Sequence, residues 1–139
     1  MNRESAMDIM TSSPNVVFPF VVEGRKGERR IELDSVYDLY NTRFPGDGAD
    51  PVEVIQQDDT SFTFLTLSGH FRGPGHTIKF STLERDGRLI LRQEGNSGAT
   101  TWDAVYDLGA KISWKYQADN LRAAIYGGNR AGFPGQLPW

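Results

Sequence analysis

The chain has 139 residues, a length typical of one domain that buries about two-thirds of the surface of its unfolded form. Its 15 Lys and Arg residues against 18 Asp and Glu residues give a net charge of −3, which argues against a surface that mainly neutralises phosphates. The absence of cysteine excludes disulfides and thiolate metal sites, and no stretch is apolar enough for a membrane span. We therefore expect a cytoplasmic protein without a nucleic-acid partner.

The first residues of the chain differ in composition from the rest. Residues 1–14 contain charged side chains and no apolar run, so they lack the hydrophobic region of a signal peptide. We expect them to form a disordered leader. The remaining residues, 15–139, are expected to form a single domain.

Two short apolar-rich runs, at residues 16–22 and 28–33, flank a Gly-Arg-Lys-Gly segment and predict a hairpin with a longer loop. The loop is basic, since it carries Arg25, Lys26 and Arg29, with Arg30 after them. Such a cluster occurs in phosphate-binding arms and in solvated turns, and the acidic balance of the chain favours a turn.

A short helix is predicted after this hairpin. Asp34 has a side chain suited to a helix N-cap, and Val36, Tyr37, Leu39 and Tyr40 keep an apolar face through one or two turns. The prolines and glycines that follow predict a loop.

The middle of the chain predicts an antiparallel meander. Apolar and polar residues alternate there with the period of two that is typical of strands. Asp86-Gly87 is the clearest turn, because both central residues of a type I′ hairpin need positive φ. The predicted strands cover residues 52–56, 61–68, 77–85 and 88–94.

The longest predicted element is a helix over residues 102–125, capped by Thr100 or Thr101. Its apolar residues form two stripes that face different directions. The first stripe contains Trp102, Val105, Tyr106, Gly109, Ile112 and Tyr116, and the second contains Trp114, Ala118, Leu121 and Ile125. The predicted fold class is therefore α+β, with an antiparallel sheet of about six strands packed on a long C-terminal helix.

Several segments in this order resemble a known superfamily. They are Pro51-Val-Glu-Val-Ile-Gln-Gln-Asp-Asp59, Phe62-Thr-Phe-Leu-Thr-Leu-Ser-Gly-His70, Thr77-Ile-Lys-Phe80 and Asp86-Gly-Arg-Leu-Ile-Leu91. Over residues 51–125 the chain resembles the START-like helix-grip (SRPBCC) superfamily, in particular an uncharacterised branch whose signature is a strand ending Thr-Leu-Pro-Gly-His. Ser68 stands here in place of the proline, and Gly73-Pro74-Gly75 stands in place of an acidic turn.

The resemblance implies a helix-grip fold with an apolar cavity between the sheet and the C-terminal helix. That branch has no agreed activity, so the resemblance assigns no catalytic residue. The aromatic side chains on the predicted sheet and helix are suited to line such a cavity, and a few polar groups are suited to orient its ligand. The candidate ligand-binding residues are Phe62, Phe64, His70, Phe80, Arg92, Trp102, Tyr106 and Tyr116.

An enzymatic alternative rests on the glycine-rich turn that holds both histidines of the chain. His70 and His76 are suited to exchange protons in general acid–base catalysis, and Arg72 between them is suited to hold an anion. Such a pair is typical of a small hydrolase or a toxin-like nuclease, and the helix-grip fold also suggests a cyclase or dehydratase. A metal site needs a third ligand, so no metal or other cofactor is expected.

Three functions therefore stay open from the sequence. The first is binding of a hydrophobic or lipid-like small molecule, the second is catalysis by His70 and His76, and the third is protein interaction through the second helix stripe. We expect a monomer or a homodimer in each case.

Overall fold

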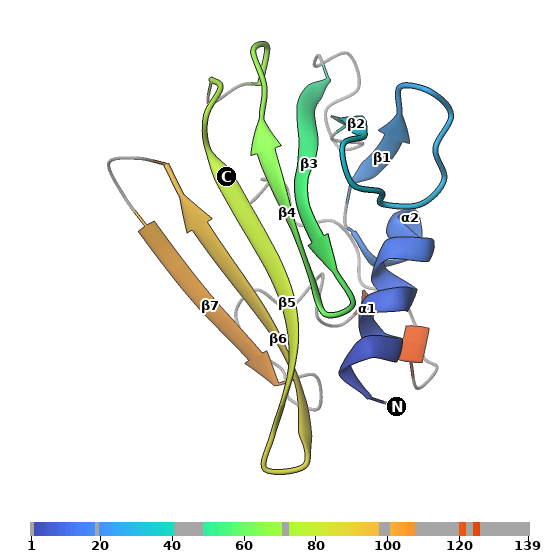
Figure 1. Ribbon diagram of the computed structural model, residues 1–139, viewed down its shortest axis with the longest axis vertical. Coiled ribbons are helices and arrows are strands. Elements are labelled where there is room, and N and C mark those ends of the chain that lie inside the picture. The colour runs from blue at the N-terminus through green and yellow to red at the C-terminus, as the bar shows by residue number, and fades with distance from the viewer. Residues whose placement is uncertain are drawn as a thin grey trace.

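The computed structural model describes residues 2–18, 20–40, 49–70, 73–97, 101–107, 120–121 and 124–125. These residues form a seven-stranded antiparallel sheet in which each strand pairs with the next one along the chain (Figure 1). Two short helices precede the sheet. The strands are Val21–Gly24 (β1), Val36–Tyr40 (β2), Asp50–Asp58 (β3), Ser61–Thr66 (β4), Thr77–Arg85 (β5), Arg88–Asn96 (β6) and Thr101–Asp107 (β7).

The predicted meander is confirmed. Strands β3 to β6 lie where residues 52–94 alternate in polarity, and β5 has the predicted bounds. Asp86 and Gly87 join β5 to β6 with φ angles of 53° and 75°, as a type I′ turn requires. The strand pairs continue without a crossover, so the sheet is built from local connections.

The predicted fold class, a sheet packed on one long C-terminal helix, is wrong. Residues 101–107, where that helix was expected to begin, form strand β7 and pair with β6 from Asn96 to Ile90. Helical backbone is described only at residues 120–121 and 124–125 of the predicted span. Trp102, Val105 and Tyr106 of the first apolar stripe therefore lie on a strand. Most of the second stripe, including Trp114 and Ala118, lies outside the described residues.

The N-terminal part of the chain also differs from expectation. Residues 1–14, for which the sequence predicts a leader, contain helix α1 (Arg3–Ser12), and helix α2 (Pro14–Val17) follows. The Asn2 side chain caps α1 by accepting a hydrogen bond from the Ser5 amide at 2.8 Å, and Pro14 begins α2, where its missing N–H is not needed.

The predicted hairpin and helix before residue 41 are wrong as well. Strand β1 covers only Val21–Gly24, and residues 28–33 form no strand. Residues 36–40 form strand β2 instead of a helix. Tyr37 and Leu39 are buried there and their neighbours are half-buried, which is the alternation of a strand with two different faces.

The core lies on one face of the sheet, called here the inner face. Helix α1 covers part of it, and the Thr82 hydroxyl on β5 donates a hydrogen bond to the Arg3 carbonyl at 2.7 Å. Burial of each large apolar side chain contributes roughly 1.5–3 kcal/mol. The largest fully buried side chains include Met7, Met10, Phe18, Ile31, Tyr37, Leu39, Phe62, Phe64, Ile78, Phe80 and Leu91.

The edge of strand β1 is closed by a side chain. The Asn15 amide accepts a hydrogen bond from the Val22 N–H at 2.7 Å and donates one to the Val22 carbonyl at 3.1 Å. Asn15 thus takes the place of a neighbouring strand at this position. Covered edges prevent a sheet from pairing with other chains.

We expect Asn15→Ala to lower the free energy of unfolding by about 1–3 kcal/mol, because both backbone groups of Val22 lose their partner. The opened edge should also favour association at high protein concentration. Urea unfolding and sedimentation at several concentrations measure the two effects. Val16→Ala, a change at an exposed neighbour on α2, is the control. Equal stability of the two variants would contradict this role of Asn15.

Candidate functional site

The other face of the sheet, called here the outer face, has a hollow lined mostly by polar residues over strands β4 to β7. Side chains alternate along a strand, so the residues next to Phe62, Phe80 and Leu91 point to this face. A groove of about 540 Å³ lies there. It is lined by Thr63, Thr77, Lys79, Glu94, Gly95, Asn96, Thr101 and Asp103. This volume is in the usual range for small-molecule sites.

Strand register arranges outer-face side chains in two rows, whose members from β4 to β7, except Leu65, line the groove. Neighbouring strands lie about 4.8 Å apart, so register partners on one face are in reach of one another. The first row runs across the sheet through Gln56, Thr63, Lys79, Glu94 and Asp103. The second row runs beside it through Leu65, Thr77, Asn96 and Thr101. Each strand from β4 to β7 thus contributes one residue to each row.

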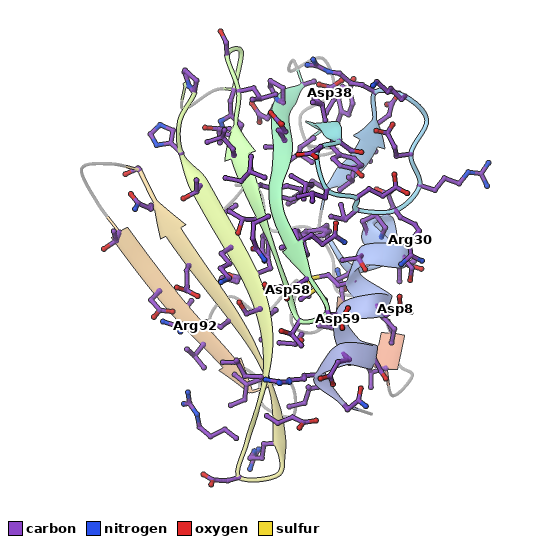
Figure 2. All side chains as sticks on the ribbon, in the orientation of Figure 1. Asp8, Arg30, Asp38, Asp58, Asp59 and Arg92 are labelled. Atoms are coloured by element: carbon purple, nitrogen blue, oxygen red, sulfur yellow. The ribbon has the colours of Figure 1, made fainter. Side chains whose placement is uncertain are left out.

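Arg92 binds two carboxylates at the border of the groove. Its guanidinium donates hydrogen bonds to Asp103 at 3.1 and 2.6 Å, and its Nε lies 3.5 Å from Glu94 Oε1. The hydrogen bonds from Arg92 lower the pKa of Asp103 below its ordinary value. The sequence places Arg92 among the candidate ligand-binding residues, and the structure places it beside the groove, on the β6–β7 side of the sheet (Figure 2).

The pair of Arg92 and Asp103 predicts a pH effect. Because the folded pKa of Asp103 is lowered, the pair stabilises the fold above the ordinary Asp pKa of about 3.9 and loses this contribution as the pH falls through the folded pKa. In Arg92→Gln we expect the Asp103 pKa to rise toward the ordinary value, as measured by carbon NMR titration of its carboxyl. Arg25→Gln, which removes the partner of Asp38 instead, should leave Asp103 unchanged. An unchanged Asp103 pKa in Arg92→Gln would refute the assigned cause.

Lys79 is the cation inside the groove. It is half-buried, and within the described residues its ammonium makes no ion pair, although Glu94 is its register partner on β6. The Thr77 hydroxyl on the same strand makes no hydrogen bond within that part of the chain either. Thr63 is already engaged, because its hydroxyl donates to Gln56 Oε1 at 2.7 Å. Lys79 and Thr77 therefore offer donors to a molecule in the groove.

Comparison with known proteins does not identify a family for this chain. No family model, curated protein or solved structure matches the chain. The resemblance of residues 51–125 to the helix-grip superfamily therefore stays a prediction.

The two histidines lie on the loop between β4 and β5, which Thr66 organises. The Thr66 hydroxyl donates to the Gly73 carbonyl and accepts from the His76 amide, both at 2.9 Å. His76 is half-buried and His70 is 4% exposed, so little of the His70 surface is open to a substrate. Arg72 lies outside the described residues. The general acid–base role of this pair stays a prediction.

The candidate aromatic residues separate into two groups. Phe62, Phe64 and Phe80 lie on the inner face, where their ring centroids are 5.1–6.0 Å apart. They are core residues, and contact of any of them with a ligand stays a prediction. Trp102 and Tyr106 lie on strand β7, opposite Gly95 and Leu91, and their side chains are outside the described parts. Tyr116 falls outside the described residues.

A second charged region surrounds α1 and the β3–β4 turn (Figure 2). A hollow of about 180 Å³ there is bordered by Asp8, Arg30, Asp58 and Asp59. Arg30 pairs with Asp8 at 3.2 Å, and the Thr60 amide donates to Asp58 at 2.9 Å, which lowers the pKa of Asp58. Within the described ranges, no group of three or more acidic, His or Cys residues is arranged to hold a metal ion.

The basic loop is consistent with a solvated turn. Arg25 donates three hydrogen bonds to Asp38, at 3.0–3.3 Å, and Arg30 pairs with Asp8. Two of its four cations are therefore neutralised by side chains of the same chain. In the described part of the chain, no helix is both long enough and apolar enough to cross a membrane.

Sequence reasoning missed most residues that line the groove. Lys79 and Thr77 alternate with buried Ile78 and Phe80, so their outward direction was readable from the pattern. Asp103 was hidden because its segment was predicted to be helical. The groove could not be recognised without the pairing of β6 with β7, which brings Asp103 opposite Glu94.

Proposed function

We propose that the protein binds a small polar molecule in the groove on the outer face of the sheet. The observation that carries this proposal is the groove itself, about 540 Å³ lined by hydroxyl, amide and charged side chains from four consecutive strands. A rigid sheet holds such groups at fixed spacing, which favours selective binding over adventitious contact. The ligand expected here is polar, unlike the hydrophobic molecule suggested by the sequence.

The packing of the inner face also favours a ligand site on the outer face. Phe80 contacts the rings of Phe18, Phe62 and Phe64 at centroid distances of 5.1–6.0 Å, so these rings pack directly against one another. The described part of the inner face is thus a packed core. The groove on the outer face is lined instead by hydroxyl, amide and charged side chains, which suit a polar ligand.

The proposal is tested by blocking the groove. A library of small polar molecules is titrated into the ¹⁵N-labelled protein, and ligands are identified by shifts of the amides of Lys79, Glu94 and Asp103. Thr101→Trp places a large side chain in the groove and should abolish these shifts. Val105→Trp, on the same strand and face but outside the groove lining, is the matched control and should retain them. The absence of any groove ligand, or equal binding by both variants, would refute the proposal.

A further inference from the structure

The groove contains opposite charges in separate places, and this distribution indicates the class of its ligand. The inference rests on the proposed function. On one side, the ammonium of Lys79 makes no ion pair within the described residues. On the other side, Glu94 turns toward Arg92, whose guanidinium is already held by Asp103. Lys79 therefore lacks the counterion that strand register would otherwise supply.

The Lys79 side of the groove suits a carboxylate. An ammonium and a hydroxyl both donate hydrogen bonds, and Lys79 and Thr77 are alternate residues of one strand that point to the same face. A carboxylate between them accepts from both donors. Hydrogen bonds between charged groups are roughly twice as strong as those between neutral groups.

The β6–β7 side of the groove suits an ammonium group. Glu94 and Asp103 carry two negative charges, and Arg92 supplies one positive charge, so this cluster keeps one net negative charge. Both carboxylates line the groove. Each ionised carboxylate has more acceptor sites than the bonds from Arg92 occupy.

We propose that the ligand is a small amino carboxylate, with its carboxylate at Lys79 and Thr77 and its ammonium group toward Glu94 and Asp103. Lys79 and the Arg92 cluster together carry no net charge, which matches a zwitterion better than a simple anion or cation. In the reversed orientation the ligand ammonium would meet Lys79 and its carboxylate would meet Glu94 and Asp103, so repulsion between like charges would oppose that orientation. Lys79 is thus the residue that selects for the carboxylate.

Four compounds with one carbon skeleton test this assignment. We expect γ-aminobutyrate to bind at least about tenfold more tightly than butyrate or butylamine, a difference of about 1.4 kcal/mol. We expect the affinity of γ-hydroxybutyrate to lie between that of γ-aminobutyrate and that of butyrate, because a hydroxyl donates a hydrogen bond but carries no charge. Affinities are measured by amide shifts in NMR titrations. Equal binding of γ-aminobutyrate and butylamine would overturn the carboxylate assignment.

Variants of Lys79 locate the selectivity. Lys79→Met should lower the affinity for γ-aminobutyrate by about tenfold or more, whereas the affinity for butylamine, which has no carboxylate, should not fall. Lys79→Arg retains a cation and should preserve most of the affinity, and melting temperatures confirm that both variants fold. If neutral polyols occupy the groove and Lys79→Met changes nothing, this inference fails while the proposed function stands. If no compound shifts the groove amides, both fail.

Discussion

Replacing Phe80 with alanine is expected to lower the free energy of unfolding by about 3–5 kcal/mol. The Phe80 side chain is 0% exposed and contacts the rings of Phe18, Phe62 and Phe64. Its removal leaves a cavity at the centre of this cluster and also forfeits the edge-to-face contacts of the rings. A loss of this size is a large fraction of the stability of an ordinary domain, which is about 5–15 kcal/mol. Urea unfolding followed by tryptophan fluorescence measures it.

Two further variants distinguish cavity formation from a general effect of substitution. Phe80→Leu retains most of the volume and should cost less than Phe80→Ala. Val105→Ala, on the outer face where the side chain is 42% exposed, should change stability by about 0.5 kcal/mol or less. A cost of Phe80→Ala below about 1 kcal/mol would show that these rings do not form the packed core.

Removal of residues 1–12 is expected to destabilise the fold by at least about 4 kcal/mol. This segment contains α1, whose Met7 and Met10 are buried in the core, and truncation of each such methionine costs about 2–5 kcal/mol. The truncated chain also loses the bond from the Thr82 hydroxyl to Arg3 and the bond from the Ile31 amide to Thr11. Urea unfolding of the full and truncated chains measures the difference.

Point variants separate the buried and exposed sides of α1. Met10→Ala alone should cost about 2–5 kcal/mol. Glu4→Ala should have little effect, because its ion pair with Arg3 is half-exposed and surface pairs contribute about 0–1 kcal/mol. Full stability of the chain without residues 1–12 would mean that α1 is not part of the folded unit.

The middle of the fold was predictable because its signals are local. Strands β3 to β6 show alternation of polarity, and Asp86-Gly87 satisfies the positive φ angles of their central turn. Each of these strands pairs with its neighbour in sequence, so no distant contact had to be known. Here local propensity and tertiary pairing agree.

Strand β7 was not predictable because its sequence satisfies two periodicities. Trp102, Val105 and Tyr106 have the spacing of a helical face, whereas Trp102, Ala104 and Tyr106 have the alternation of a strand. The pairing of residues 101–107 with β6 decides between them. This decision depends on a partner strand and not on the segment itself.

Strand β2 and helix α1 were missed for a different reason. Asp34 was predicted to cap a helix, but its φ is 66°, so it reverses the chain before β2. In α1, Ala6, Met7 and Met10 have helical spacing, yet the charged residues Arg3, Glu4 and Asp8 of the same short segment conceal its apolar face. Burial of that face against the sheet stabilises the helix, because isolated helices of this length are marginal in water.

The candidate site depends on the same pairing as strand β7. The sequence predicts Arg92 as a polar group on a strand, but it predicts a helix for the segment of its hydrogen-bond partner Asp103. Lys79 has no local motif around it. Its significance comes from the lack of an ion pair in the described part of the chain, which only the arrangement of side chains across the sheet reveals.

The groove exists only if β7 completes the sheet beside β6, so the most direct test is the NMR assignment of residues 101–107. We expect extended-backbone chemical shifts throughout this segment and cross-strand NOEs between the register partners Glu94 and Asp103. Loss of those NOEs, with helical shifts from residue 101 onward, would contradict both the seven-stranded sheet and the site built on it.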